Sequence, residues 1–355
     1  MKSRSLLILA LAAVAAGVAY WAYPRRPAHP VAPVITTAEA ATPEAATPEA
    51  PSASDAPASV PAPAAGPAQP SPSLHDAFDA HQAYLYTAQV TGFGARWPGS
   101  PGHQKTEDLI HSVLTRDGAV IATDDFIADT PRGKVPVHNI IGKFNVSSNP
   151  NQPIFILAGH YDTLFKPAGF VGANDGGSST AILLAFADAL RHHKTNMQIW
   201  LVWTDLEEAV NSFTSTDGLY GSRHLAQKLA AEGLVPRIKG FFLLDMIGDK
   251  DLDVDKESTS TGWLQDFIAA AAKQLGYQKY FFQYSSEIID DQVSFANVGI
   301  PVVDVVDATF GPMPGDGMGA WHHTLQDTMD KVSEHSLMVV GRTVLLAVEM
   351  IDAQS

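Results

Sequence analysis

The sequence predicts a single α/β domain with a central, mostly parallel mixed β-sheet that is flanked by helices on both faces. Apolar runs of strand length alternate with segments of helical spacing along residues 75–355. Hydrophobic residues make up 46% of the chain and charged residues 17%, which is the composition of an ordinary globular protein. About 280 residues lie in this part, which is the size of one large domain. Strands that alternate with helices are typical of a largely parallel sheet covered on both sides.

The predicted elements follow in chain order. Helical spacing predicts helices at 75–90 and 104–115, separated by a loop at 92–102 that is rich in glycine and proline. Two strands at 119–126 and 137–144 come next. The remaining elements are a strand at 153–158, a helix at 178–192, a strand at 197–203, a helix at 221–232, a strand at 240–244, a helix at 262–275, a strand at 299–306 and a closing helix at 333–351.

Two further segments precede the domain. Residues 1–26 carry an apolar run at 6–23 between basic residues, and this length is at the lower limit for crossing a bilayer. We favour an uncleaved signal-anchor over a cleaved signal peptide. Residues 27–74 consist mainly of Ala, Pro, Thr, Ser and Glu without aromatic residues, so they predict a disordered linker. The domain would then lie on the extracytoplasmic, periplasmic side, anchored to the membrane or secreted, and we expect it to be a monomer.

Charge and cysteine content exclude some classes of protein. The formal net charge is −15 and no basic tract is present, which argues against a nucleic-acid-binding protein. Cysteine is absent, so the fold cannot depend on disulfides.

Chemically active residues follow the predicted strands. Two adjacent carboxylates, Glu207 and Glu208, lie just past the strand at 197–203, where open α/β sheets bind their ligands. The other strand ends and the loops beside them carry His160, Asp162, Asp175, Asp245, Asp290, His322 and His323. Imidazole and carboxylate ligands from separate strand ends are typical of a catalytic zinc site with an open position. Asp162, two residues after His160, is placed to orient that imidazole.

In five motifs the chain resembles the zinc-dependent aminopeptidases and their relatives, the animal-type glutaminyl cyclases. These motifs are Gly159-His160-Tyr161-Asp162, Gly172-Ala173-Asn174-Asp175, Glu207-Glu208-Ala209, Leu244-Asp245-Met246 and His323-Thr324, with Asp327-Thr328 after them. The segments 217–226 and 290–306, and Trp321 before the histidines, are more similar to the cyclases.

The resemblance implies a role for each matching residue. Asp175, Glu208 and His323 would bind zinc, with His322 as the less favoured alternative to His323. Glu207 would be the acid/base, with Asp245 and Asp290 as its carboxylate partners. Phe213, Phe310 and Trp321 would line the substrate pocket. Asp304 stands where the animal enzymes usually have a histidine, so the polar wall of the pocket would differ.

Three functions remain open at this point. We favour a cyclase with one Zn²⁺ per chain that converts the N-terminal glutamine of peptides or proteins to pyroglutamate and releases ammonia. The alternative is an aminopeptidase with two Zn²⁺ ions, in which His160 and Asp245 complete a second site and Asp175 bridges the metals. The third is a non-catalytic extracytoplasmic binding domain.

Overall fold

The computed structural model describes residues 73–312 and 317–355. The predicted anchor at 1–26 and nearly all of the predicted linker at 27–74 therefore lie outside the described residues. Among the helices of the described ranges, none is long and apolar enough to cross a membrane.

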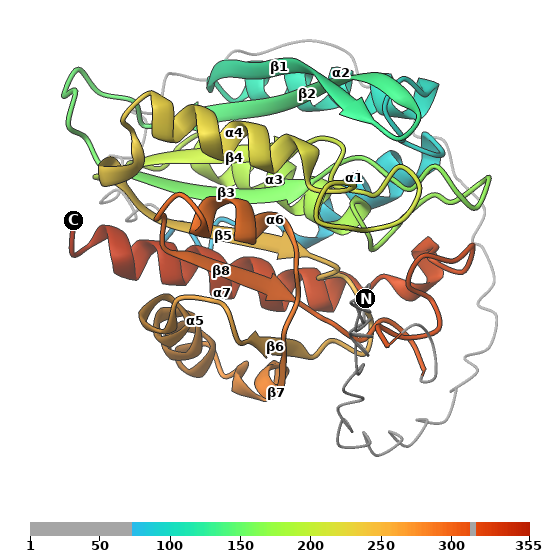
Figure 1. The fold of residues 1–355 in the computed structure, drawn as a ribbon. Coiled ribbons are helices and arrows are strands. Elements are labelled where there is room, and N and C mark those ends of the chain that lie inside the picture. The colour runs from blue at the N-terminus through green and yellow to red at the C-terminus, as the bar shows by residue number, and fades with distance from the viewer. Residues whose placement is uncertain (1–72, 313–316) are drawn as a thin grey trace, which may run out of the picture. The chain divides into compact units, whose positions relative to one another are not determined.

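The core of the fold is a six-stranded sheet in the order β1-β2-β4-β3-β5-β8 (Figure 1). Its strands are β1 (Val120–Thr130), β2 (Gly133–Phe144), β3 (Ile154–His160), β4 (Gln198–Thr204), β5 (Ile238–Asp245) and β8 (Val302–Val306). The last four strands in the spatial order run parallel, whereas β2 is antiparallel to both β1 and β4. The prediction of a mostly parallel mixed sheet is confirmed.

Helices cover both faces of the sheet. Successive strand residues point to opposite sides, so each strand contributes side chains to both faces. Every residue of β3 and β4 is buried. Phe155 and Leu157 pack into the larger core under one group of helices, whereas Ile154 and Ile156 pack into a second core under the other group. The first group contains α1 (Ala80–Gly92), α2 (Pro101–Arg116), α3 (Gly177–Leu190), α5 (Gly262–Gln274) and α7 (Glu334–Asp352). The second contains α4 (Tyr220–Ala231) and α6 (Asp291–Ala296), which lie in front of the sheet in Figure 1.

Some elements differ from the prediction. Helix α1 begins at Ala80 instead of residue 75, and α2 begins at Pro101, inside the segment predicted as loop. Both ends have a side-chain cap, because Asp79 accepts a hydrogen bond from the backbone of Gln82 and Ser100 accepts one from His103. Helix α6 was not predicted from the sequence, and neither was a small parallel sheet formed by β6 (Val254–Glu257) and β7 (Phe281–Ser286).

The two edges of the main sheet serve different purposes. The C-terminal ends of β3, β4, β5 and β8 meet at one edge, which we call the catalytic edge. The chain joins the fold at the other edge, because Leu74 is buried and its backbone N–H donates to Glu349 in the last turns of α7. The end of α7 lies beside the start of β4, since Asp352 accepts hydrogen bonds from the backbone N–H groups of Asn196 and Met197.

The β1–β2 hairpin projects past the catalytic edge. Strand β2 pairs with β4 only from Ile140 to Phe144, and residues 133–139 continue beyond the end of β4. The turn at Pro131 and Arg132 consequently lies on the same side of the sheet as the carboxyl ends of the parallel strands.

Candidate metal and catalytic site

The residues predicted for the site meet at the catalytic edge. His160 and Asp245 are the last residues of β3 and β5, and Glu207 and Glu208 follow β4 after a short turn. Asp175 lies in the glycine-rich loop before α3. Gly176, which follows it, has a φ of +73°, and a Cβ there would lie 2.6 Å from the carbonyl oxygen of Asp162, so this position favours glycine.

Asp175, Glu208 and His323 converge on one point. His323 Nε2 lies 3.3 Å from Asp175 Oδ2 and 3.4 Å from Glu208 Oε2. Ligands about 2.0–2.2 Å from a tetrahedral zinc ion stand about 3.4 Å apart, so these separations fit the metal. Asp175 Oδ2 and Glu208 Oε1 are also buried atoms without a hydrogen-bond partner of ordinary geometry, as expected of groups arranged for a cation. The three residues therefore fit a zinc ion.

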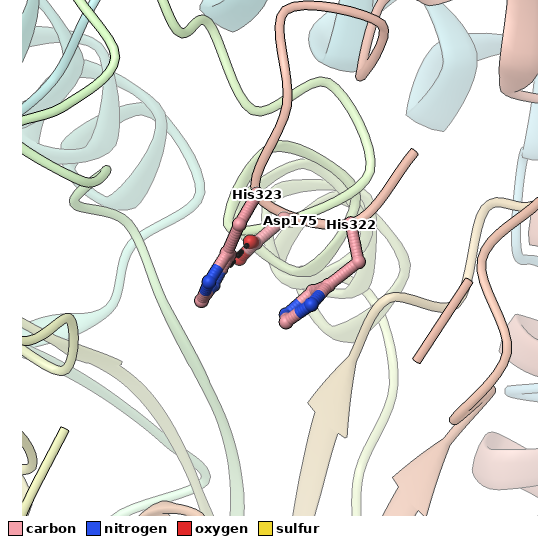
Figure 2. A group of neighbouring side chains, drawn as sticks. All are labelled: Asp175, His322 and His323. Atoms are coloured by element: carbon pink, nitrogen blue, oxygen red, sulfur yellow. Dashed lines mark ion pairs between the residues drawn. The ribbon is translucent and has the colours of Figure 1, made fainter. Parts of the chain in front are cut away.

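His322 lies beside this group. Figure 2 shows both imidazoles reaching from neighbouring positions toward the same region as Asp175. The two rings stack with centroids 3.6 Å apart, and ligand atoms of Asp175, His322 and His323 all lie within 4.8 Å of one another. Both histidines are thus within reach of a shared ion. The group that includes Asp175 and Glu208 contains His323.

A second group of potential ligands adjoins the first. His160 Nε2 lies 3.1 Å from Asp175 Oδ1 and 3.2 Å from Asp245 Oδ1. Asp175 belongs to both groups and offers one oxygen to each. The arrangement has the ligand types and the shared carboxylate that the two-metal alternative requires.

Crowded carboxylates shift the pKa values in this region. Burial alone would raise the pKa of Asp175, but the imidazoles of His160 and His323 outweigh it and hold that pKa well below its ordinary value. Burial and the Asp175 carboxylate raise the pKa of Glu208 to about 8. A nearby cation would relieve this repulsion, which is a second reason to place a metal here.

Glu207 lies in a cluster of acids. Burial, followed by the charge of Asp290, raises the pKa of Glu207 well above its ordinary range. Burial and the charge of Asp245 do the same for Asp290. The charge of Asp290 therefore acts on Glu207, and that of Asp245 acts on Asp290. A carboxyl group with a raised pKa suits proton transfer near neutral pH.

Asp304 extends this cluster on β8. Its side chain is fully buried and neither carboxylate oxygen has a hydrogen-bond partner. Burial and the charges of Asp290, Asp245 and Glu257 raise its pKa well above the ordinary 3.8. Asp304, which the sequence predicts as part of the pocket wall, thus lies close enough to the predicted catalytic carboxylates Asp245 and Asp290 to be affected by their charges.

We expect Asp304→Asn to change how stability depends on pH. An acid whose pKa is raised by folding stabilises the native state fully below its unfolded pKa, and this contribution is lost as pH rises toward the folded value. The wild-type melting temperature should therefore fall relative to Asp304→Asn as the pH rises above about 4, by about 2–4 °C for each kcal/mol of lost stability. Thermal unfolding of the metal-free proteins measures this difference. The exposed Asp266→Asn is the control, and a constant gap between wild type and Asp304→Asn would contradict the expectation.

Two buried aspartates hold the backbone of the site residues. Asp327 accepts hydrogen bonds from the backbone N–H groups of Asn174 and Asp175, at 2.8 and 3.0 Å. Asp162 accepts from those of Glu207 and Glu208, at 3.1 and 3.3 Å. His160 Nδ1 lies 3.5 Å from Asp162 Oδ1, which is the contact that the predicted orientation of His160 by Asp162 requires.

We expect Asp327→Asn to lower zinc affinity by about 10–100-fold, the usual effect of losing a group that supports a metal ligand. The new amide can accept from only one of the two backbone N–H groups and turns a donor toward the other. Competition with a chelator measures the affinity. Asp217→Asn is the matched control, because Asp217 also binds three backbone N–H groups but none of a proposed ligand. Equal zinc affinities for the two variants would contradict the role of Asp327.

Arg96 was not assigned a role from the sequence, yet it is fully buried behind the site. Its guanidinium donates to the backbone carbonyl oxygens of Tyr161, Val171, Gly172 and Asp175. Burial lowers its pKa to about 10, and the charges of Asp327 and Asp175 oppose that shift. Arg96 thus joins the loop after β3 to the loop that carries Asp175.

The backbone is unusual at the site. Six non-glycine residues in the described ranges have a positive φ, and three of them, Leu206, Met246 and His323, belong to or adjoin the predicted site residues. Such conformations are costly and cluster at functional sites.

The three aromatic residues predicted for the substrate pocket differ in burial and in their contacts. Phe310 is buried and packs edge-on against Trp321, with ring centroids 5.5 Å apart. The Trp321 ring also faces the ammonium groups of Lys250 and Lys331, at 5.2 and 5.1 Å. Phe213 is 47% exposed and lies against Gly218 in the loop after the glutamate pair. Within the described ranges, the ring contact therefore joins Phe310 to Trp321 and does not include Phe213.

Comparison with known proteins gives the same picture as the motifs. A profile of peptidase family M28 matches residues 139–348. The chain is 28% identical to glutaminyl-peptide cyclotransferase from Bos taurus in an alignment of 279 positions that covers 68% of this chain and 74% of the other. Among solved structures, the glutaminyl cyclase of an Acidobacteriales bacterium is 40% identical with a TM-score of 0.75, covering 82% of this chain and 100% of that one. A Zn-dependent exopeptidase from Parabacteroides distasonis is 28% identical with a TM-score of 0.67, covering 78% and 98%.

Proposed function

Because this chain belongs to peptidase family M28, we propose from its site that it is a zinc-dependent glutaminyl-peptide cyclotransferase. It converts the N-terminal glutamine of peptides and proteins to pyroglutamate and releases ammonia. The observation that carries this function is the pairing of two parts of the site. Asp175, Glu208 and His323 converge as a zinc-binding group, and Glu207 lies next to them among the acids Asp245 and Asp290. The 40% identity to a glutaminyl cyclase over that whole chain supports the same function.

The reaction needs one proton transfer in each direction. The α-amino nitrogen attacks the carbonyl carbon of the side-chain amide, and the C–N bond to the departing ammonia breaks. Glu207 takes the proton from the α-amino group and returns it to the leaving nitrogen. Because its pKa is raised, Glu207 binds a proton more tightly than an exposed carboxylate does, and its proton affinity is closer to that of an amine. Bound zinc supplies the Lewis acid that polarises the amide carbonyl.

The other site residues hold these groups in place. Asp162 binds the backbone of Glu207 and Glu208, so the base and a proposed ligand are positioned by one carboxylate. Asp327 and Arg96 do the same for the loop of Asp175. Such fixed groups lower the cost of reorganisation during the reaction.

A two-zinc aminopeptidase is the second candidate. The group formed by His160, Asp175 and Asp245 favours it, and so does the likeness to a Zn-dependent exopeptidase. In that function, Glu207 would deprotonate a water molecule instead of an amine.

Two peptides separate the candidates. The zinc-loaded protein is incubated with a glutamine-initiated peptide and a leucine-initiated peptide, and the masses of the products are measured by mass spectrometry. Loss of ammonia from the first, with the second intact, is the expected result. Release of a free N-terminal amino acid would show the aminopeptidase, and no turnover of either by a zinc-loaded protein would indicate a binding domain.

For the cellular setting we propose an extracytoplasmic enzyme that is monomeric and held at the membrane by its N-terminal segment. The apolar run at 6–23 between basic residues, followed by an Ala/Pro-rich segment, supports this location. Cell fractionation tests it: recovery of the full-length chain in the cytoplasmic soluble fraction would contradict the anchor.

A further inference from the structure

Four side chains form a cluster outside the candidate metal site, and we call it the rim cluster: Trp97, Arg132, Phe165 and Asn211. The Arg132 guanidinium lies over the Phe165 ring, 4.9 Å from its centroid. Its Nε donates to Asn211 Oδ1 at 3.1 Å. Trp97 stacks on Phe165 with ring centroids 5.4 Å apart and planes at 27°. These side chains come from the β1–β2 turn and from three loops, so the cluster exists only in the folded protein.

The rim cluster is joined directly to the site. Phe165 packs against a small core that contains Leu206 and Val210, the residues on either side of the Glu207–Glu208–Ala209 segment. Asn211 is three residues after Glu208, and three residues of chain span at most about 10 Å. The cluster therefore lies within a short peptide's length of the proposed zinc ligands.

The Arg132 side chain is held in place, but most of its hydrogen-bond donors are not used. Its side chain is exposed, and only Nε makes a hydrogen bond within the described ranges. No carboxylate within these ranges forms an ion pair with it, and Asp129 on the same hairpin is paired with Lys134 at 2.7 Å. Two terminal NH₂ groups remain on a guanidinium held by a ring and an amide. This is the geometry that binds a carboxylate through two parallel hydrogen bonds.

The position of Arg132 indicates which carboxylate it would meet. The N-terminal residue of the substrate must occupy the metal site, so the rest of the peptide has to leave along the catalytic edge. An extended peptide advances about 3.3 Å per residue and covers about 10 Å in three residues. The third or fourth residue of the substrate is thus the one that reaches Arg132.

We propose that the rim cluster binds the substrate peptide beyond its N-terminal residue, and that Arg132 selects an acidic side chain at the third or fourth position. Trp97 and Phe165 provide an aromatic surface for the intervening residues. This inference rests on the proposed function, since it needs a peptide whose N-terminus lies in the metal site.

The test compares two glutamine-initiated pentapeptides that differ only in having Asp or Lys at the third and fourth positions. The full-length zinc-loaded protein should convert the acidic peptide with the higher kcat/KM, by about threefold to fivefold, because an exposed ion pair contributes up to about that factor. In Arg132→Ala the ratio should fall to about one, and in Arg132→Glu it should invert. The ratio is measured on one variant at a time, so differences in the amount of active protein cancel.

Lys134 supplies the matched control, because it lies on the same hairpin but its ammonium group is paired with Asp129. Lys134→Glu changes the net charge as much as Arg132→Glu and should leave most of the acidic preference in place. If Lys134→Glu and Arg132→Glu changed the acidic preference equally, the preference would come from the overall electrostatic field of the hairpin. That result would overturn the assignment to Arg132. An unchanged ratio in the Arg132 variants would overturn it as well, with the proposed function intact. Failure of the wild-type protein to form pyroglutamate from either peptide would instead overturn the proposed function.

Discussion

Glu207→Gln should lower kcat/KM for a glutamine-initiated peptide by about 10²–10⁴-fold, the usual contribution of a general acid–base. Glutamine has nearly the same shape as glutamate but can neither take the α-amino proton nor return it to the leaving nitrogen. The zinc content should stay close to wild type, because the converging ligand group contains Glu208 and not Glu207. Initial rates with one peptide, together with metal analysis of the same preparation, measure both quantities.

The control for this prediction is the neighbouring Glu208→Gln, which should lose zinc as well as activity. If Glu207→Gln also lost its metal, the roles of the two glutamates would have to be exchanged. If it kept both metal and rate, the proton would be carried by another group, and Asp290 would be the first to test because its charge influences Glu207.

Asp175→Asn should remove all bound zinc and all detectable turnover. Asp175 is the one residue that belongs to both groups of potential ligands, with Oδ2 toward His323 and Oδ1 toward His160. An amide has lost the negative charge that both imidazoles face. Zinc per chain is measured after dialysis against a weak chelator, and the rise in melting temperature on adding zinc is measured in parallel.

Two histidine variants then count the metals. His323→Ala should lower the zinc content in either function. His160→Ala should leave one zinc per chain in the single-metal cyclase and should remove one of two ions in an aminopeptidase. Full zinc occupancy in Asp175→Asn would contradict the site as a whole, and full occupancy in His323→Ala would move the ligand role to His322.

The sheet was predictable because β3, β4, β5 and β8 are apolar runs of strand length. The small sheet was not, because β6 has only four residues and β7 alternates only weakly between buried and exposed positions. The start of α2 at Pro101 was missed although Ser100 and Pro101 form a regular helix start, because the glycines around them favoured a loop.

Within the site, the proposed metal ligands leave a clearer pattern in the sequence than the residues that support them. Metal ligands belong to a few residue types at strand ends, so their pattern shows in the sequence. Arg96 binds four backbone carbonyl oxygens, and such contacts leave no pattern of spacing. Phe213 and Trp321 lie on long loops, where residue type does not determine which neighbours a side chain meets. Asp304 could be located on its strand, but its place among the acids depends on how β8 aligns with β5.

The entry of the chain at Leu74, on the edge opposite the active site, sets how the enzyme can be presented on a solid support. A tag placed before residue 73 attaches a bead or a sensor chip to the back of the molecule, since Leu74 is bound to the last turns of α7. The rim cluster and the zinc ligands then face the bulk solution. Coupling through the β1–β2 turn would place the support directly in the path of arriving peptides.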